Sequence, residues 1–521
     1  MDSIKTEECI AIDFGTSNTA VYTYKNGKYL NPVYTVENYY CIPSVAVVDK
    51  HSIIIPDIVN QTQVKNGFVY NVKRILGKVE SQFEDSEIDE RMFNSPLKFD
   101  EHQNPYFEVS YRVKKSKETR NVYPIEVVTE ILKRCKEEAD NLLDTSPEFR
   151  DCVMTIPNYF FDTSKKALRE AAKRAGLNVL YFLKEPTAAG IRFISDSNEI
   201  REGEMVMVFD FGGGTLDLTL MVRNGDDFDV KAQGGDPNLG GTKIDEIFCK
   251  YVLQKYKNEN GEDLLGNDVD SKKYKRCYPK LLEFCRQAKE QMSTQNKATI
   301  FISDFIDNDD VETNKDIEIT VEEFNACILI DGEIIRRIDR AINNLFFENR
   351  YDKEHISYVI LIGGSSKIPH IQNHLKDLFK SVPVSNTRDY NPHTTVVEGA
   401  MRVKVNNWYH EVSESLECCL GFKVSDGHNN SEIRIDLYPG LRIPFTIEDY
   451  FNLSGSDIDV YRSFNGKERI EGTIKVKEAL EEFGQQKIRV KITCNKDTSI
   501  VYSVYSDDDR EIGRLELSPK I

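Results

Sequence analysis

The chain has 521 residues, of which 40% are hydrophobic and 30% are charged, a composition typical of soluble globular proteins. A chain of this length is too long for one hydrophobic core, so we expect several domains. The formal net charge of -18 argues against general nucleic-acid binding, which requires a basic face.

We expect no signal that would direct the chain out of the cytoplasm. Its eleven cysteines are scattered without a CxxC pair, as expected for reduced thiols, and their spacing supports no metal site. The N-terminus MDSIKTEEC lacks a basic region followed by an apolar one, so we expect no signal peptide. No apolar run is long enough to cross a bilayer. We therefore expect a cytoplasmic protein that binds neither membranes nor nucleic acid.

The first half of the chain alternates strands with helices. Strands are expected at Ile10–Ile12, Val21–Tyr24, Val45–Val48 and Cys152–Pro157. From about Pro124 to Asp144, apolar residues recur every three or four positions, which predicts a helix with one buried stripe. A second helix should be capped by Thr163 or Ser164 and end at Gly176. This alternation predicts parallel sheets with helices on their faces.

The pattern changes after Gly399. A polar stretch from about Met401 to Leu416 is a plausible linker. Beyond it the hydrophobic period is two, in Ile433–Leu437, Ile474–Lys477 and Lys487–Cys494, which predicts a small antiparallel sandwich. The resulting domains are residues 1–403, a linker at 404–416, and the sandwich at 417–521.

A strand that ends in aspartate and runs into a glycine-rich turn occurs twice. The two copies are DFGTSN (Asp13–Asn18) and DFGGGTLD (Asp210–Asp217). Glycine lets backbone N–H groups approach phosphate oxygens, and the carboxylates suit a hydrated Mg²⁺. Two such turns facing each other would hold a polyphosphate from both sides, which predicts two similar lobes with a nucleotide between them.

Either turn alone would be weak evidence, because chance turns contain DFG or GGG. A protein kinase is excluded because no HRD loop or strand-lysine motif is present, and a P-loop protein because GxxxxGK[ST] is absent. A third glycine turn, LIGGSSKIP (Leu361–Pro369), again follows an apolar strand and strengthens the signal.

Taken together, these motifs resemble those of the seventy-kilodalton heat-shock chaperone (Hsp70) family, within the actin–hexokinase superfamily. Further matching stretches are VKRILG (Val72–Gly77), IPNYF (Ile156–Phe160), AGLNVL (Ala175–Leu180), EPTAAG (Glu185–Gly190) and NLGGTKID (Asn238–Asp245). The resemblance implies a two-lobed α/β actin-like ATPase domain, with a duplicated ribonuclease-H-like core, followed by an antiparallel β-sandwich. Actin or a sugar kinase would share the paired turns but not EPTAAG followed by a sandwich.

The resemblance also implies roles for single residues. ATP or ADP is expected with Mg²⁺, and K⁺ near Asp210 and Asp217. Phosphoryl transfer to water would rest on positioning and charge stabilisation. The implied catalytic residues are Lys73, Glu185, Asp210, Thr215 and Asp217, and the implied Mg²⁺ carboxylates are Asp13 and Asp210. The implied nucleotide-binding residues are Asp13, Gly15, Thr16, Ser17, Asn18, Gly212, Gly213, Gly214, Gly240, Gly241, Arg286, Lys289, Glu290, Ser293, Gly363, Gly364, Ser365 and Lys367.

The implied adenosine pocket departs from the family pattern. The family usually has an acidic residue where Arg286 stands, an arginine or an apolar residue where Glu290 stands, and an arginine where Lys367 stands. Our hypothesis is that Glu290 and Lys367 either pair across the pocket or weaken it. His393 stands where an aspartate is usual, and a surface histidine is favoured over a pH switch.

The sandwich resembles the family's peptide-binding half, with RIPFT (Arg442–Thr446) and IDVYRSFNG (Ile458–Gly466) as echoes. Unfolded or extended polypeptide is the expected ligand, and J-domain co-chaperones and nucleotide exchange factors are the implied partners. The stretch Trp408–Cys419 lacks the family's four-leucine linker run, which bears on coupling between the domains. The sequence stops at Ile521 after the sandwich, so we expect no helical lid and fast peptide exchange.

The sequence therefore predicts a slow, ATP-dependent, chaperone-like ATPase. Two alternatives remain open. One is a nucleotide-bound scaffold or regulator that does not hydrolyse ATP. The other is an actin-like filament protein or small-molecule kinase, against which the terminal sandwich argues.

Overall fold

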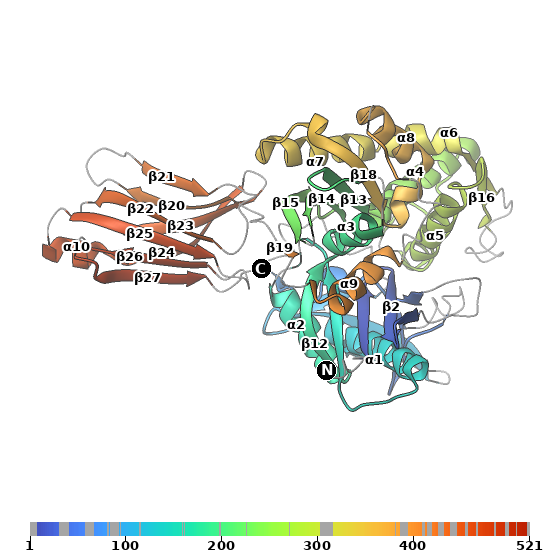
Figure 1. Ribbon diagram of the computed structural model, residues 1–521. Helices are drawn as coiled ribbons and strands as arrows, with labels where there is room; N and C mark the ends of the chain where they lie inside the picture. The colour runs from blue at the N-terminus through green and yellow to red at the C-terminus, as the bar shows by residue number, and fades with distance from the viewer. Residues whose placement is uncertain are drawn as a thin grey trace.

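The computed structural model describes most of the chain. The described residues are 8–30, 41–57, 67–80, 83, 93, 95–113, 116–158, 160, 162–196, 200–225, 227–269, 271–302, 316–380, 382–385, 394–408, 412–413, 419–425, 432–437, 445–453, 457–464, 467–483, 486–494, 500–506 and 508–517. Figure 1 shows a large α/β part beside a β-sandwich formed by the C-terminal strands.

The first lobe, lobe I, is built on one mixed sheet with the strand order β12-β11-β1-β2-β3. Its strands are β1 (Cys9–Phe14), β2 (Asn18–Lys25), β3 (Lys28–Leu30), β11 (Arg150–Ile156) and β12 (Leu177–Lys184), with β4 (Cys41–Pro43) on β2. The first two strands form an antiparallel hairpin, and β11 and β12 add parallel to β1. The predicted strands Ile10–Ile12, Val21–Tyr24 and Cys152–Pro157 are therefore confirmed, with ends that differ by one to three residues.

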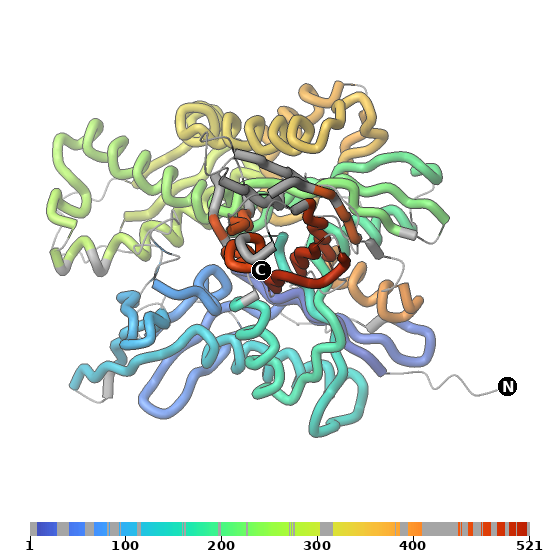
Figure 2. The backbone as a smooth tube through the Cα atoms, turned by 90° about the vertical axis from the view of Figure 1, so that its left-hand side faces the viewer, coloured from blue at the N-terminus to red at the C-terminus, as the bar shows by residue number. Residues whose placement is uncertain are grey.

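Lobe II repeats this arrangement, with the strand order β18-β13-β14-β15-β19. Its strands are β13 (Met205–Phe211), β14 (Leu216–Asn224), β15 (Asp227–Asp236), β18 (Ile356–Ile362) and β19 (Val412–Ser413). Again a hairpin, β13–β14, is extended by a parallel strand, β18, on the side of its first strand. Figure 2 shows the two lobes one above the other. The duplicated core expected from the resemblance is present.

Two helices cross between the lobes. Helix α3 (Glu185–Asp196) follows β12 of lobe I but packs on β13 and β14 of lobe II. Helix α9 (Thr395–Val405) packs on β1, β2 and β11 of lobe I. The helices touch at Gly399, where a Cβ would lie 1.8 Å from Ala188 O, so the crossing requires glycine. The ion pair between Arg192 and Glu398, at 2.6 Å, joins them.

The remaining helices surround the two sheets. They are α1 (Pro124–Leu143), α2 (Asp162–Arg174), α4 (Gly241–Asn260), α5 (Lys272–Gln291), α6 (Val321–Glu323), α7 (Ile334–Glu348) and α8 (Pro369–Leu378). Proline at the first position of α1 confirms the predicted start. The prediction that Thr163 or Ser164 caps the next helix is wrong, because α2 already begins at Asp162. Gly176 follows α2 with a φ of 75°, as a helix-terminating glycine requires.

Three small sheets and several short turns complete the two lobes. The sheets are β6-β5-β7 (Ile53–Ile54, Ala46–Val48, Phe68–Val69), β10-β9-β8 (Ser116–Val122, Pro105–Val113, Leu97–Phe99) and β16-β17 (Lys297–Ile300, Ile317–Thr320). The turns are the 3₁₀ segments η2 (Val72–Arg74), η8 (Lys353–His355) and η9 (Gly364–Lys367). A π-helix, η7 (Phe324–Ile330), lies between α6 and α7. The predicted strand at Val45–Val48 thus lies in a separate small sheet.

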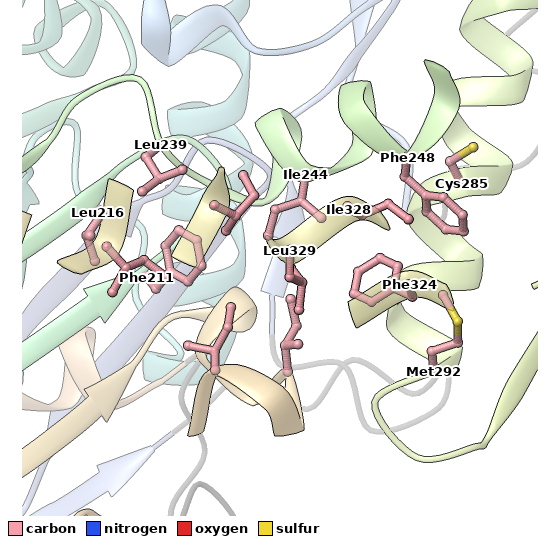
Figure 3. Close-up of a cluster of buried hydrophobic side chains, with 14 of the residues drawn as sticks. Phe211, Leu216, Leu239, Ile244, Phe248, Cys285, Met292, Phe324, Ile328 and Leu329 are labelled. Atoms are coloured by element: carbon pink, nitrogen blue, oxygen red, sulfur yellow. The ribbon is translucent and has the colours of Figure 1, made fainter. Parts of the chain in front are cut away.

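The core of lobe II lies directly behind the second glycine turn. Phe211 and Leu216, which flank that turn, are fully buried. Figure 3 shows the same cluster continuing through Ile244 and Leu329 to Phe248 and Phe324. The last two rings meet edge to face, with centroids 5.3 Å apart. Close packing on one side therefore fixes the position of the turn.

The C-terminal strands form two antiparallel sheets, which confirms the predicted sandwich. One sheet has the order β21-β20-β23-β24 (Glu432–Leu437, Cys419–Ser425, Ile458–Phe464, Lys467–Ile474). The other has the order β22-β25-β26-β27 (Phe445–Leu453, Gln486–Cys494, Ile500–Tyr505, Glu511–Leu517). As predicted, β25 buries Ile488, Val490, Ile492 and Cys494.

One predicted strand of the sandwich is wrong beyond its first residue. The strand predicted at Ile474–Lys477 ends at Ile474, and helix α10 (Lys477–Phe483) begins at Lys477. Asp457 explains the change, because its carboxylate accepts hydrogen bonds from the N–H groups of Val476 and Lys477, at 3.0 and 3.1 Å. Such capping stabilises the start of a helix and competes with a continued strand.

Part of the predicted linker belongs to the large α/β part. Helix α9 continues to Val405, and the ring of Trp408 lies 5.3 Å from that of Phe228. Strand β19 then adds to the edge of β15 in parallel register, Val412 opposite Phe228. Within the described part of this stretch, residues up to Val405 are helical and Val412–Ser413 form a strand before the sandwich begins.

Candidate functional site

The two glycine turns face each other across the lobes. A Cβ on Gly213 would lie 2.8 Å from Ser17 Oγ, and one on Gly214 would lie 3.0 Å from Thr16 Oγ1. Gly15 is required by the first turn itself, since a Cβ there would lie 2.2 Å from the carbonyl oxygen of Asn18. The prediction of two opposed turns is thus matched by contacts between their residues.

The carbonyl groups of the second turn are anchored on the side of lobe II. Gly212 O accepts hydrogen bonds from Gly241 N and Ser365 Oγ, at 3.0 and 2.8 Å. Gly213 O accepts from the N–H and the hydroxyl of Thr242, both at 2.8 Å. Within the described residues, the N–H groups of Gly213 and Gly214 donate no hydrogen bond. The turn therefore retains donors for an anion.

The glycines of two other predicted segments pack against this turn. A Cβ on Gly240 would lie 2.5 Å from the carbonyl carbon of Gly214. Gly363 has a φ of 79°, and a Cβ there would lie 2.3 Å from Phe211 O and 2.8 Å from Asp210 Oδ1. These glycines allow three backbone segments to meet at one point.

Four carboxylates and one lysine gather beside the turns. Asp13 and Asp210 each lie one residue before the end of their strands, β1 and β13, Asp217 lies on β14, and Glu185 opens α3. Lys73, in η2, donates to Glu185 Oε1 at 2.5 Å and is only 7% exposed. The ammonium also lies 5.8 Å from the centre of the Phe14 ring. The cluster therefore carries more negative than positive charge.

The surroundings of these carboxyl groups change their acidity. Burial, together with the charges of Glu185, Asp217 and Asp13, raises the pKa of Asp210 well above its usual range. Burial raises the pKa of Glu185 to about 7 in spite of Lys73. Burial lowers the pKa of Lys73, but Glu185 and Asp13 outweigh it and raise the pKa overall. Perturbed groups of this kind are typical of functional sites.

Polar neighbours orient two of the carboxylates. Thr155 Oγ1 donates to Asp13 Oδ1 at 2.6 Å. Thr215 Oγ1 donates to Asp217 Oδ2 at 2.6 Å, and the N–H of Asn158 donates to Asp217 Oδ1 at 3.1 Å. Among the described residues, no three His, Cys, Asp or Glu side chains are arranged as direct ligands of one metal ion.

Helix α5 supplies the predicted adenosine-side residues. Lys289 is 8% exposed and pairs with Asp245 at 2.8 Å, while donating to Gly241 O at 3.2 Å. Burial raises the pKa of Asp245 to about 6 even beside this lysine. Lys289 thus connects α5 to the start of α4, next to the second glycine turn.

The exposed face of α5 carries a charged network. Arg286 donates to both oxygens of Glu283, at 2.9 and 2.5 Å, and to Glu290 Oε1 at 2.6 Å. Burial lowers the pKa of Lys367, and the charge of Glu290 acts against this decrease. Our hypothesis allowed Glu290 either to pair with Lys367 or to weaken the pocket. The ion pair that Glu290 forms is with Arg286.

The structure brings most of the predicted site residues together. The turns Gly15–Ser17 and Gly212–Gly214 meet, the five charged residues adjoin them, and Gly240, Gly241, Gly363 and Ser365 pack behind. Gly364 and Lys367 lie in η9, and Ser293 follows α5. Asn18 begins β2 and is exposed. His393 and Arg442–Pro444 lie outside the described residues.

Three residues of the site were missed by sequence reasoning. They are Thr155, which binds Asp13, Asn158, which binds Asp217, and Asp245, which binds Lys289. The signal for Thr155 was present, because it lies near the end of a strand whose register places it opposite Asp13. The other two follow from tertiary packing.

The comparisons with known proteins agree with this architecture. The family model described as Hsp70 protein matches residues 9–413. The chain belongs to the Hsp70 family. Among curated Hsp70 relatives, it is 29% identical over 395 residues to "Chaperone protein dnaK" of Phaeodactylum tricornutum. It is 28% identical over 394 residues to a "Ribosome-associated molecular chaperone" of Zygosaccharomyces rouxii.

Each of these two matches covers 75% of this chain and 60% of the relative. The chain therefore aligns with less than two thirds of the length of these relatives. Among the described residues, no helix is long and apolar enough to cross a membrane.

Proposed function

We propose that this protein is an ATP-dependent molecular chaperone that hydrolyses ATP slowly and binds unfolded or extended polypeptide in the cytoplasm. The observation that carries the proposal is the pair of opposed glycine turns, within contact distance of each other, beside a buried lysine–carboxylate cluster. Family membership supports ATP as the nucleotide.

The residues present fit a polyphosphate with Mg²⁺. The N–H groups of Gly213 and Gly214 are free to donate within the described part of the chain, and the excess of buried carboxylates suits a divalent cation. Asp13 and Asp210 would hold Mg²⁺, through water by analogy with the family. Bound Mg²⁺ would neutralise developing charge on the phosphates. A K⁺ ion near Asp210 and Asp217 is part of the same proposal.

The chain's own groups would position and activate water. Lys73, held by Glu185, would orient the attacking water and stabilise negative charge on the γ-phosphate. Glu185, with a pKa of about 7, can accept or return a proton near neutral pH. Thr215 and Asn158 would fix Asp217, and Thr155 would fix Asp13.

The sandwich would bind the polypeptide. Its two four-stranded sheets have the architecture expected of a peptide-binding half, and main-chain hydrogen bonding is a common way to hold an extended peptide. J-domain co-chaperones and nucleotide exchange factors are proposed as partners on family grounds alone.

A nucleotide-bound regulator without hydrolysis is the second candidate. The observation in its favour is the network on α5, the helix expected to contact adenosine. There Arg286 donates a hydrogen bond to Glu290. This candidate predicts nucleotide binding without turnover.

Steady-state ATP hydrolysis tests the proposal. Turnover that depends on Mg²⁺, rises with an unfolded peptide and is lost in Lys73→Ala would support it. Nucleotide binding without turnover above the Lys73→Ala level would favour the regulator.

A further inference from the structure

One residue outside the predicted site joins the lobes at the level of the carboxylates. Asn158 follows β11 of lobe I, and its partners lie on β14 of lobe II. Its backbone N–H donates to Asp217 Oδ1 at 3.1 Å. Its side-chain Nδ2 donates to Leu218 O at 3.5 Å and to Thr219 Oγ1 at 3.4 Å. One asparagine thus contacts three consecutive residues of the opposite lobe.

An asparagine is energetically unfavourable at position 158. Its side chain is only 5% exposed, and its Oδ1 has no hydrogen-bond partner in the described part of the chain. A buried acceptor without a donor is destabilising, so its presence calls for a compensating role. The two side-chain donor contacts to lobe II are the interactions that an alanine here could not make.

The side-chain contacts are long for hydrogen bonds and would strengthen if the lobes closed further. Contacts at catalytic sites are often long before substrate binds and tighten afterwards. Thr215, of lobe II, holds Asp217 Oδ2, whereas Asn158, of lobe I, holds Asp217 Oδ1. The orientation of Asp217 therefore depends on both lobes at once.

We propose that Asn158 is an interlobe clasp that holds the lobes closed and, through its backbone N–H, positions Asp217 on closure. The lobes are also joined where α3 and α9 cross, at Arg192 and Glu398. The clasp acts on Asp217, which adjoins the glycine turns, so Asn158 is a positioning residue. Its effect on nucleotide release rests on the proposed function, but the clasp itself does not.

Two variants and one control separate the clasp from general stability. Asn158→Ala removes the side-chain bonds and keeps the backbone N–H to Asp217. Asn158→Asp has the same shape but replaces the amide donor with a carboxylate facing Leu218 O. The control is Asn349→Ala, at the end of α7, where Nδ2 donates to Leu345 O at 2.8 Å and Oδ1 likewise lacks a partner among the described residues.

Hydrogen exchange of the nucleotide-free protein is measured first. We expect the amides of residues 158 and 217–219 to exchange about fivefold faster in Asn158→Ala, the factor that one net hydrogen bond corresponds to, and faster still in Asn158→Asp. Asn349→Ala should leave these rates unchanged. Unchanged exchange in both Asn158 variants would overturn the clasp, whether or not the protein binds nucleotide.

Release of a fluorescent ADP analogue and single-turnover ATP hydrolysis are measured next. Release should be about fivefold faster in Asn158→Ala, and hydrolysis slower, while the control matches the wild type. Faster exchange with unchanged release and hydrolysis would overturn the role in the nucleotide cycle. A wild type that binds no nucleotide would instead refute the proposed function, and the exchange data would still decide the clasp.

Discussion

Lys73 Nζ lies 2.5 Å from Glu185 Oε1, so the short turn η2 is joined to the first residue of the interlobe helix α3. The lysine is 7% exposed and the glutamate 14%. Removing one partner of a buried ion pair leaves the charge of the other uncompensated, which is destabilising. Each of these two charges is therefore stabilised by the other. The pair places a cation beside the two glycine turns and the aspartates.

Lys73→Ala should lower single-turnover ATP hydrolysis at least about 100-fold, because a preorganised cation at the reacting phosphate is lost. Nucleotide affinity, measured by calorimetry, should change much less, since the glycine turns remain. Lys73→Arg keeps the charge but alters its geometry, and it should retain the fold with reduced turnover. Near wild-type hydrolysis in Lys73→Ala would contradict the role given to this residue.

Asp210→Asn should stabilise the nucleotide-free protein at high pH. Burial and three neighbouring carboxylates raise the pKa of Asp210, so the unfolded chain releases this proton at a lower pH than the folded chain does. Stability contributed by this group therefore falls as pH rises above its unfolded pKa. The amide removes the penalty, and Tm should rise by roughly 1–3 °C at pH 8 and by much less at pH 4.

The matched control for that measurement is Asp49→Asn. N–H groups of His51 and Ser52 lower the pKa of Asp49, so this group contributes stability that is present above its unfolded pKa and lost on acidification. Its substitution should therefore lower Tm at pH 8 or leave it unchanged. A Tm of Asp210→Asn at or below that of the wild type at pH 8 would count against the electrostatic account.

Glu290→Ala should raise ATP affinity several-fold with little effect on stability. The substitution removes a carboxylate near Lys367 and releases Arg286 from one of its partners. The exposed pair contributes only about 0–1 kcal/mol to folding. Calorimetric titration with ATP decides the point. Unchanged affinity would mean that Glu290 does not weaken the pocket.

Gly399→Val should destabilise the protein by about 3 kcal/mol or prevent folding, because any Cβ there would collide with the backbone of α3. Gly234→Ala is the control, since its nearest neighbour, at 3.2 Å, is the flexible Cδ1 of Leu345. Chemical denaturation compares the two. Equal stabilities would show that the helices separate easily at the crossing.

Trp408 is the only tryptophan in the sequence and packs on Phe228. Its fluorescence therefore reports directly on the segment that carries β19. Phe228→Ala should shift the emission to longer wavelength, because the indole would lose a ring neighbour and become more hydrated. Identical emission spectra would mean that this contact does not form in solution.

The main architecture could be predicted because it depends on local patterns. The strand–Asp–glycine turns at Asp13 and Asp210 carry their own conformational requirement, and the period of two in Lys487–Cys494 fixes which side chains are buried. Each of these signals is contained within a single short segment of the chain. They were sufficient for the fold class.

The partner of Glu290 is Arg286 rather than Lys367, a pair that the helical spacing of four residues on α5 favours. The remainder depended on contacts between distant segments. Asp457, whose carboxylate caps the start of α10 and so ends the strand before it, lies 19 residues from Val476 in the sequence. The bonds of Asn158 to β14 join residues 60 and 61 positions apart. Nothing in the local sequence encodes such pairings.

The most direct test of the account is steady-state ATP hydrolysis by the full chain with Mg²⁺, with and without an unfolded peptide, and with Lys73→Ala as the blank. The account predicts slow turnover that increases with peptide and disappears in the variant. Nucleotide binding with no turnover above the blank would contradict it and favour a nucleotide-bound regulator.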